Sequence, residues 1–196
     1  GLSAPAPETG PRIDPATLRA DLCGVLFEAP PAPDVVPIAS FSDYYCPFCR
    51  VLTQRLAEIE AGSDGAVRIA WHEWPLLGAT SEVAAKAALA AKRQGAYIGF
   101  QKALMRGAFV ATPAFLTNLA SRLDIDADRM LADMERAETV HAIAESRALA
   151  RLFGFPGTPA LVVGRTVVVG ETDEATLRAL IERERADGPI PACARV

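Results

Sequence analysis

The sequence lacks the runs and clusters that identify a membrane-spanning, nucleic-acid-binding or metal-binding protein. No apolar run approaches the roughly 18 residues of a bilayer-spanning helix, and no basic run predicts binding to nucleic acid or an anionic membrane. The two histidines, His72 and His141, lack the spacing of a ligand pair. Residues 1–12 have neither the charged nor the apolar region of a signal peptide. What remains is a chain of 196 residues, 51% apolar with a net charge of −4, which suits one domain or one domain with an insertion.

Two of the four cysteines, Cys46 and Cys49, form a CxxC pair in SDYYCPFCRVLTQRL, where an apolar run gives way to a helical pattern. Cys46 is expected at a helix N-terminus with Pro47 in the first helical position. Unpaired backbone N–H groups and the positive end of the helix dipole should favour its thiolate. Cys49 lies one turn later on the same face and is expected to be more buried. An exposed acidic thiol followed by a shielded thiol suits disulfide exchange.

A zinc site and a structural staple are the alternatives for this pair. Structural zinc usually takes four ligands from two local pairs, and the sequence has a single CxxC. A disulfide that closes so short a loop adds little stability. A working dithiol is therefore the favoured interpretation, with no metal ligand and no cofactor beyond the cysteines themselves.

The other two cysteines, Cys23 and Cys193, lie near opposite ends of the chain. An even cysteine count is compatible with an oxidising compartment. A bridge between them would close a loop of 170 residues, worth about 5 kcal/mol in the chain-entropy model. The alternative is two unrelated thiols, each a small hydrophobic core residue. We favour the bridge.

Hydrophobic periodicity predicts an α/β protein in which a small mixed sheet is capped by a block of helices. We expect, in order, a disordered lead over 1–14, a short helix over 16–28, a strand over 35–41, a helix from the cysteines to Gly62, a strand over 66–74, helices throughout 80–152, a hairpin over 159–170 that turns at Gly164-Arg165, and a final helix that ends at Gly188-Pro189. The expected helix N-caps are Ser81, Thr112, Asp126 and Thr172. Pro37 predicts an edge position or a late start to pairing for the first strand.

The motif CPFC after a strand, together with GTP (157–159) before a hairpin, resembles the thioredoxin-fold oxidoreductases. The run WPLLGATSEVAAKAALAAKRQGAYIGFQKALM (74–105) is similar to the DsbA/ScsC-like branch of bacterial exported thiol:disulfide oxidoreductases. The resemblance implies a thioredoxin-like domain over 34–78 and 153–188, split between its βαβ and ββα halves by an inserted helical domain over 79–152. The lead, short helix and Pro-rich linker over 1–33 and a tail over 189–196 flank it.

The resemblance also implies roles for individual residues. Cys46 would be the nucleophile and Cys49 the thiol that resolves a mixed disulfide, with Pro47 and Phe48 between them. Pro159 would be a cis-proline that holds its loop against the dithiol. The backbone of Thr158 would then pair with an extended substrate as an added strand.

The family further implies a periplasmic protein, exported and lacking its signal peptide in this sequence, that exchanges disulfides with client proteins. The favoured activity is a DsbA-like thiol oxidase with a DsbB-like membrane partner. The alternatives are a ScsC/DsbC-like isomerase or reductase with a DsbD- or ScsB-like partner, and a copper- or zinc-handling thiol protein. A bridge at Cys23 would tether the N-terminal arm, which favours a monomer. No nucleic-acid partner is expected.

Two residues depart from the family pattern. Ser40 occupies a position, six residues before Cys46, where many relatives carry an acidic residue that accepts a proton from the resolving thiol. Asp43 and Glu73 are the nearby carboxyl groups that could replace it. Phe48 occupies a position where strongly oxidising relatives have histidine. Because phenylalanine stabilises a thiolate neither by charge nor by a hydrogen bond, we expect a less oxidising disulfide than theirs.

Overall fold

The computed structural model describes residues 11–193. Most of the lead expected to be disordered, and the end of the tail, lie outside these residues. The elements are η1 (Pro15–Asp21), α1 (Leu22–Phe27), β1 (Val36–Ser42), α2 (Pro47–Ala61), β2 (Val67–Glu73), α3 (Ala79–Lys92), α4 (Tyr97–Met105), α5 (Pro113–Arg122), α6 (Ala127–Asp133), α7 (Ala137–Leu152), β3 (Ala160–Val163), β4 (Thr166–Val169) and α8 (Glu174–Ala186). The expected α/β fold class is confirmed.

The four strands form one mixed sheet in the order β2-β1-β3-β4. β1 runs parallel to β2, antiparallel pairs join β1 to β3 and β3 to β4, and the last pair is the expected hairpin around Gly164. The register pairs Phe41 near the end of β1 with Ala160 at the start of β3. Residues 158–159, just before β3, are therefore placed beside the segment that follows β1.

β1 is a central strand, so the expectation of an edge position from Pro37 was wrong. Every residue of β1 is buried. The alternative expectation, a late start to pairing, describes the β3 side, where pairing begins at Ile38. The carbonyl of Pro37 accepts from the N–H of Gly164, in the hairpin turn beyond the end of β3. Because the N and C=O of a strand residue point to the same side, the missing N–H of Pro37 faces this turn and breaks no strand pair.

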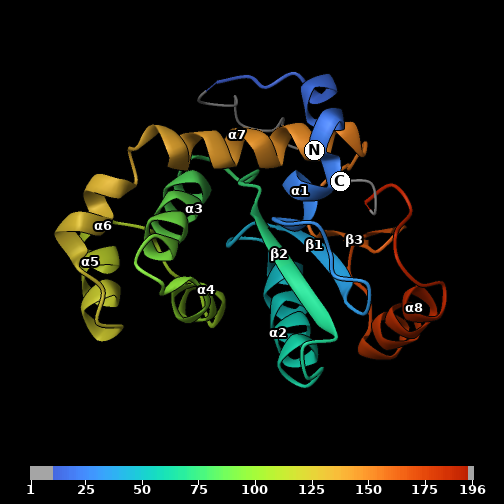
Figure 1. Cartoon of the computed structure of the whole chain (residues 1–196). Coiled ribbons are helices and arrows are strands. Elements are labelled where there is room, and N and C mark those ends of the chain that lie inside the picture. The colour runs from blue at the N-terminus through green and yellow to red at the C-terminus, as the bar shows by residue number, and fades with distance from the viewer. Residues whose placement is uncertain (1–10, 194–196) are drawn as a thin grey trace, which may run out of the picture.

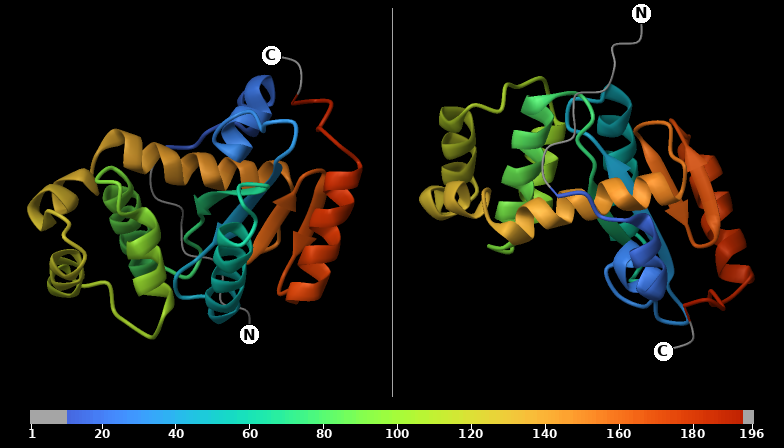
Figure 2. Two further views of the ribbon diagram at one scale, coloured as in Figure 1. Left: turned by 60° about the horizontal axis from the view of Figure 1, so that its bottom comes forward. Right: turned by 90° about the horizontal axis from the view of Figure 1, so that it is seen from above.

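Alternating residues of β1 enter two hydrophobic cores, one on each face of the sheet. Ile38 packs with side chains of α2 and α8, whereas Phe41 packs with Leu149 of α7 and Phe155. This alternation is the two-residue period of a strand buried on both faces. Figure 1 and Figure 2 show α2 and α8 on one side of the sheet, and α7 crossing the other side next to α1.

The helices α3 to α6 form a group beside the sheet, and α7 extends from that group to the sheet (Figure 1). The Ala-rich helix α3 has most of its alanines buried, so small side chains allow close helix packing. The segment that follows the cap at Asp126, expected to be helical as far as residue 152, is interrupted at residues 134–136 between α6 and α7. The expected helix over 16–28 starts as the 3₁₀ segment η1.

Local capping signals were correct where the cap is a short-range contact. Thr112 and Asp126 accept from the N–H groups of Phe115 and Arg129. The expectation for Ser81 was wrong, because α3 begins after Gly78 and the Ser81 hydroxyl donates to the Asp43 carboxylate, 2.9 Å away. The expected N-cap at Thr172 was also wrong, by one residue: Asp173 caps α8 by accepting a hydrogen bond from the N–H of Thr176.

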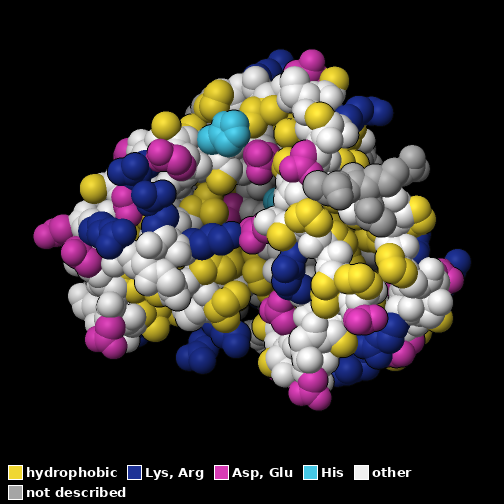
Figure 3. All heavy atoms as spheres, in the orientation of Figure 1, with side chains coloured by type: hydrophobic (Ala, Val, Ile, Leu, Met, Phe, Trp, Pro, Cys, Tyr) yellow, Lys and Arg dark blue, Asp and Glu magenta, His cyan; other side chains and the backbone are white. Residues whose placement is uncertain are grey.

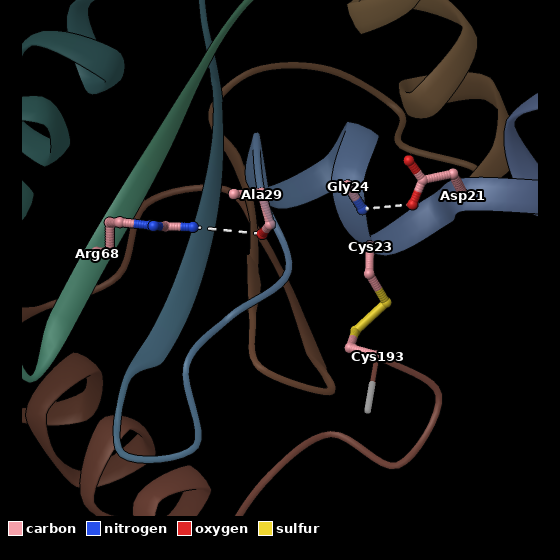
Figure 4. The surroundings of a disulfide bond; sticks show 6 residues. All are labelled: Asp21, Cys23, Gly24, Ala29, Arg68 and Cys193. Carbon is pink, nitrogen blue, oxygen red and sulfur yellow. Dashed lines mark hydrogen bonds between the residues drawn. A yellow bond between two sulfur atoms is a disulfide. The ribbon is translucent and has the colours of Figure 1, made fainter. Parts of the chain in front are cut away.

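The N-terminal segment is fixed to the rest of the molecule by a disulfide between Cys23 and Cys193 (Figure 4). Nearby, Arg68 of β2 donates to the carbonyl oxygen of Ala29 over 3.3 Å. His72 of β2 contacts the carbonyl oxygen of Leu26 through Nε2 at 2.8 Å. The expected bridge is therefore present, and side chains of β2 reinforce it.

The surface is mixed in charge. On the face drawn in Figure 3, acidic and basic side chains are interspersed, with hydrophobic side chains gathered in patches between them. None of the helices within residues 11–193 is both long enough and apolar enough to span a bilayer.

Candidate active site

The two cysteines lie at the junction of β1 and α2. A tight turn follows β1, in which the N–H of Cys46 donates to the carbonyl of Asp43 over 3.1 Å. Cys46 has an extended backbone (φ −79°, ψ 117°) and is the N-cap of α2, and Pro47 occupies the first helical position. This is the placement expected from the sequence, because proline at that position is preset for helix and has no N–H to lose.

Both thiols are buried in the structure. Cys49 is 0% exposed, as expected for the shielded member, but Cys46 is only 5% exposed, so the expectation of an exposed sulfur was wrong. The covering group comes from the loop before β3. The Cys46 thiol donates to the carbonyl oxygen of Thr158, 3.6 Å away. The peptide bond between Thr158 and Pro159 is cis, and Pro159 is buried.

The pKa of Cys46 is lowered to about 6, chiefly because the Cys49 thiol donates a hydrogen bond to its sulfur. Burial opposes this shift, while the backbone N–H groups of Cys49 and Phe48 and the side chain of Thr158 favour it. The pKa of Cys49 is raised, because its proton is held in the bond to Cys46 and its site is desolvated. The acidic thiol expected at this position is present, but backbone amides are not its main cause.

Phe48 is 52% exposed and projects from the first turn of α2. Ser40, at the position where an acid was considered, is buried in the middle of the sheet between Trp71 of β2 and Leu161 of β3. Neither residue supplies a charge to the dithiol. The causes that lower the pKa of Cys46 are hydrogen bonds from its neighbours.

Of the two carboxyl groups near the dithiol, Asp43 is fully occupied. Its Oδ1 accepts from Tyr45 N–H and the Ser81 hydroxyl, and its Oδ2 accepts from the N–H groups of Leu76 and Leu77, all within 2.9 Å. Four donors use the lone pairs of this carboxylate, so it has a structural role.

Glu73 has a different environment, at the end of β2. Its Oε1 accepts from the hydroxyls of Tyr44 and Tyr97 at 2.6 and 2.7 Å, while its Oε2 is buried and has no hydrogen-bond partner within residues 11–193. Burial raises its pKa to about 7. Sequence reasoning named Glu73 but missed Tyr97, because Tyr97 lies 24 positions further along the chain and no sequence pattern signals their contact.

The histidines are not associated with the dithiol as metal ligands. His72 is buried and stacked on Phe41 with ring centroids 4.5 Å apart, and burial lowers its pKa. His141 is exposed, 3.8 Å from Glu145. In the part of the chain that the structure describes, no three His, Cys, Asp or Glu side chains are grouped as a metal site would require.

A CxxC pair that opens a helix after a central strand, faced by a cis-proline loop, defines a thioredoxin-fold dithiol oxidoreductase. Comparison with known proteins gives the family: a profile of the DSBA-like thioredoxin domain matches residues 37–182. The chain belongs to this family and is a thiol:disulfide oxidoreductase.

Solved structures agree with this assignment. A thioredoxin-like oxidoreductase from Silicibacter pomeroyi DSS-3 is 36% identical, with a TM-score of 0.75 over 83% of this chain and 97% of that chain. The thiol-disulfide exchange protein alpha-DsbA2 of Wolbachia pipientis is 24% identical, with a TM-score of 0.73 over 86% and 94%. ScsC of Proteus mirabilis is 21% identical, with a TM-score of 0.73 over 90% and 82%. The last two share the fold.

The curated relatives are longer proteins. The Na(+)/H(+) antiporter NhaA 3 of Salinispora tropica is 30% identical over 130 residues, which are 65% of this chain and 20% of the antiporter. NhaA 1 of Salinispora arenicola matches over the same shares at 31% identity. The chain thus spans about a fifth of the length of the curated relatives it matches, and the ion exchange in their names is a property of those whole proteins.

Proposed function

We propose that the protein is a thiol oxidase that introduces disulfides into client proteins through Cys46. A client thiolate attacks the Cys46 sulfur of the oxidised pair, forms a mixed disulfide there, and releases Cys49, which takes up a proton. A second client thiolate then attacks the client sulfur and releases Cys46 as a thiolate. The client loses two electrons and the enzyme gains them as a dithiol, so a further oxidant must regenerate the Cys46–Cys49 bond.

The lowered pKa of Cys46, about 6, is the observation that carries this proposal. A thiolate that is stable at neutral pH is a good leaving group in the second exchange step. It also stabilises the reduced enzyme over the disulfide, which makes the disulfide an oxidant. The raised pKa of Cys49 keeps the second thiol protonated and unreactive after turnover.

Apolar side chains around the dithiol support an unfolded polypeptide as the substrate. Phe48 and Val51 are exposed one turn apart on α2. Leu77 is exposed and donates its N–H to Asp43, and Val110 is exposed beside Ala111, which donates to the Tyr45 hydroxyl. Exposed apolar groups of this kind mark protein-binding surfaces.

A client strand has a natural backbone partner at Thr158. This residue lies beside the Cys46 sulfur, just before β3. Its carbonyl oxygen accepts a hydrogen bond from the Cys46 thiol only while that thiol is protonated. We infer that a client segment entering beside Cys46 pairs with the Thr158 backbone, with Pro47, Phe48 and Pro159 shaping the contact.

An isomerase or reductase is the second candidate, and Phe48 is the observation that favours it. Its exposed ring gives no charge to the Cys46 thiolate, so the disulfide is a weaker oxidant than one flanked by an imidazolium. Such an enzyme would act from its reduced form, with Cys46 attacking a client disulfide. Copper or zinc handling through the two thiols is a third, weaker candidate, since residues 11–193 offer the pair no further grouped ligand.

The location and organisation are proposals that rest on the terminal bridge and the element order. A Cys23–Cys193 disulfide persists in an oxidising compartment, so we place the protein in the periplasm with a membrane redox partner. The tethered N-terminal segment favours a monomer. We assign 34–78 and 153–188 to the thioredoxin-like domain and 79–152 to the helical insertion.

Two assays with purified protein separate oxidase from isomerase. The oxidised enzyme is mixed with a reduced, unfolded client, and the reduced enzyme with a scrambled client, and native disulfides are followed by activity regain of the client. We expect rapid oxidation in the first assay and little correction in the second. In the second assay, Cys49→Ala should accumulate a mixed disulfide, because its Cys46 thiolate can attack a client disulfide and has no second thiol to release the client. Cys46→Ala should be inactive in both assays.

Faster correction of the scrambled client would replace the oxidase assignment with isomerase. Activity in Cys46→Ala equal to the parent's would contradict the role of this sulfur altogether. Stoichiometric Cu(I) that protects both cysteines from alkylation, without turnover on either client, would favour metal handling.

A further inference from the structure

The turn that ends at Cys46 is fixed by three consecutive side chains, each bound to a different segment. Asp43 accepts from Ser81 at the start of α3. Tyr45 accepts at its hydroxyl from the N–H of Ala111, before α5, over 3.0 Å. Tyr44 donates to Glu73. The helical insertion therefore contacts the reactive turn directly as well as covering the sheet.

The acceptor of the Tyr44 contact, Glu73, is a carboxyl group that also binds the insertion through a second phenol. Oε1 of Glu73 receives the hydroxyls of Tyr44 and of Tyr97, the first residue of α4. Gln101, one turn further along α4, donates to the Tyr97 hydroxyl over 3.1 Å. Arg50 of α2 holds the other end of Tyr44 by donating to its carbonyl oxygen over 3.3 Å. A chain of hydrogen bonds thus runs from α4 to the residue two positions before Cys46.

This chain is buried and its central carboxyl is incompletely bound. Glu73, Tyr44 and Gln101 are each at most 2% exposed. Oε2 of Glu73 and Oε1 of Gln101 have no hydrogen-bond partner within residues 11–193. The two short hydrogen bonds at Oε1 are stronger when the carboxyl is ionised, so they favour the charged form. The buried Oε2 without a partner favours the protonated form, because burying an uncompensated charge is costly.

The charged groups around Glu73 come from three elements. Asp43, in the reactive turn, disfavours the carboxylate, and Lys92 of α3 favours it. The Lys92 ammonium lies 5.6 Å from the centroid of the Tyr97 ring and is paired with Glu28 at 2.6 Å. Desolvation is the largest cause and raises the pKa of Glu73, the hydrogen bonds from Tyr44 and Tyr97 lower it, and with the two charges the pKa lies at about 7.

We propose that Glu73 is a positioning residue for Cys46, which holds the reactive turn to the helical insertion through Tyr44 and Tyr97 and changes that hold when it gains or loses a proton. The proposal rests on Cys46 being the sulfur that exchanges with clients. The ionised carboxylate binds both phenols in charge-assisted hydrogen bonds and keeps the turn, and with it the Cys46 sulfur, under the Thr158 loop. The protonated carboxyl binds them more weakly and lets the sulfur move.

The reactivity of Cys46 in the reduced protein alone tests this. The thiolate fraction is measured by ultraviolet absorbance from pH 5 to 9, and the rate of alkylation by iodoacetamide is divided by that fraction. In the parent, the rate per thiolate should fall as pH rises through 7, because the turn tightens. In Glu73→Gln this fall should be absent. In Tyr44→Phe the rate at pH 8.5 should rise about fivefold, the effect of one lost hydrogen bond.

Glu145→Gln is the matched control, since it makes the same change at a half-buried carboxyl on α7 that pairs with His141. It should reproduce the parent's pH dependence. If Tyr44→Phe does not fold, Tyr97→Phe removes the other phenol and carries the same expectation.

A folded Glu73→Gln that keeps the parent's fall in rate would overturn the proposal. So would a Tyr44→Phe variant that loses stability while its rate per thiolate stays unchanged, because Glu73 would then be a purely structural group. No client is present in these measurements. A protein that fails to oxidise clients but shows the expected pH dependence would contradict the proposed function and leave the role of Glu73 standing.

Discussion

The Cys46 sulfur lies 3.6 Å from the carbonyl oxygen of Thr158, a residue 112 positions further along the chain. The sheet register produces this contact, because Phe41 near the end of β1 pairs with Ala160 at the start of β3. The loop before β3 therefore crosses the turn after β1. The reactive sulfur is covered by the same backbone that we propose as the docking strand for clients, so a client that reaches this sulfur also meets the Thr158 backbone.

The first prediction concerns the origin of the acidic thiol. The hydrogen bond from the Cys49 thiol is the largest cause of the lowered pKa of Cys46. We expect Cys49→Ala to raise the pKa of Cys46 from about 6 toward its ordinary value, measured by thiolate absorbance. Cys49→Ser keeps a donor at the same place and should raise it less. A Cys49→Ala protein that still titrates near pH 6 would show that the backbone amides of α2 suffice.

The second prediction concerns the terminal disulfide. The Cys23–Cys193 bond closes a loop of 170 residues. Replacing both cysteines with alanine should lower the free energy of unfolding by about 2–5 kcal/mol, because the unfolded chain regains the entropy of the open loop. Denaturant titration measures this change. The rate of disulfide exchange at 25 °C should not follow it, since neither cysteine contacts the dithiol.

Reduction provides the control for this prediction. The parent unfolded in the presence of a strong reductant should fall to the stability of the double alanine variant under the same conditions. Equal stability of parent and variant without reductant would mean that the contacts of Arg68 and His72 hold the N-terminal segment unaided.

The sequence predicted those parts of the fold that depend on neighbours in the chain. The helix start after Cys46, the hairpin at Gly164 and the caps at Thr112 and Asp126 each follow from residues within a few positions. Cap-type residues at adjacent positions are harder to rank: Asp173, not Thr172, caps α8.

Two features that depend on distant partners, the Cys23–Cys193 bridge and the Pro159 loop against the dithiol, were expected from the cysteine count and the family resemblance, but others did not follow from local patterns. Ser81 has the residue type and position of a cap, but its partner, Asp43, lies 38 residues earlier. Pro37 has the properties of an edge residue, and only the position of the hairpin turn makes a central strand tolerable. The cover over Cys46 comes from Thr158 in the other half of the fold.

The third prediction concerns the strength of the oxidant. Phe48 is exposed beside the dithiol and supplies no charge. Phe48→His should raise the reduction potential, because an imidazolium or imidazole N–H stabilises the Cys46 thiolate and hence the reduced enzyme. A tenfold change in the equilibrium constant corresponds to about 30 mV, and we expect a shift of at least that size in a glutathione equilibrium.

Phe48→Leu is the control, since it keeps an apolar side chain and should stay near the parent's potential. If Phe48→His leaves the reduction potential unchanged, the hydrogen bonds from Cys49 and the α2 amides already stabilise the Cys46 thiolate fully. Residue 48 would then have no effect on the potential.

The last prediction concerns stability against pH. Burial raises the pKa of Glu73 to about 7 in the folded protein. The unfolded chain loses this proton near the ordinary value, so between these two values the folded state binds more protons. The contribution of Glu73 to stability is therefore full at low pH and is lost as pH rises through 7, at a cost of up to about 3 kcal/mol. Glu73→Gln removes this dependence, so the variant should gain stability relative to the parent from pH 5 to 8.

Denaturant unfolding of both reduced proteins at each pH measures the difference, in which the titration of Cys46 cancels because both proteins contain it. Glu58→Gln, on the exposed side of α2, is the matched control and should follow the parent. Parallel stability curves for the parent and Glu73→Gln would mean that Glu73 stays in one protonation state over this range. In that case the two phenol bonds from Tyr44 and Tyr97 would be stabilising the carboxylate enough to offset its burial.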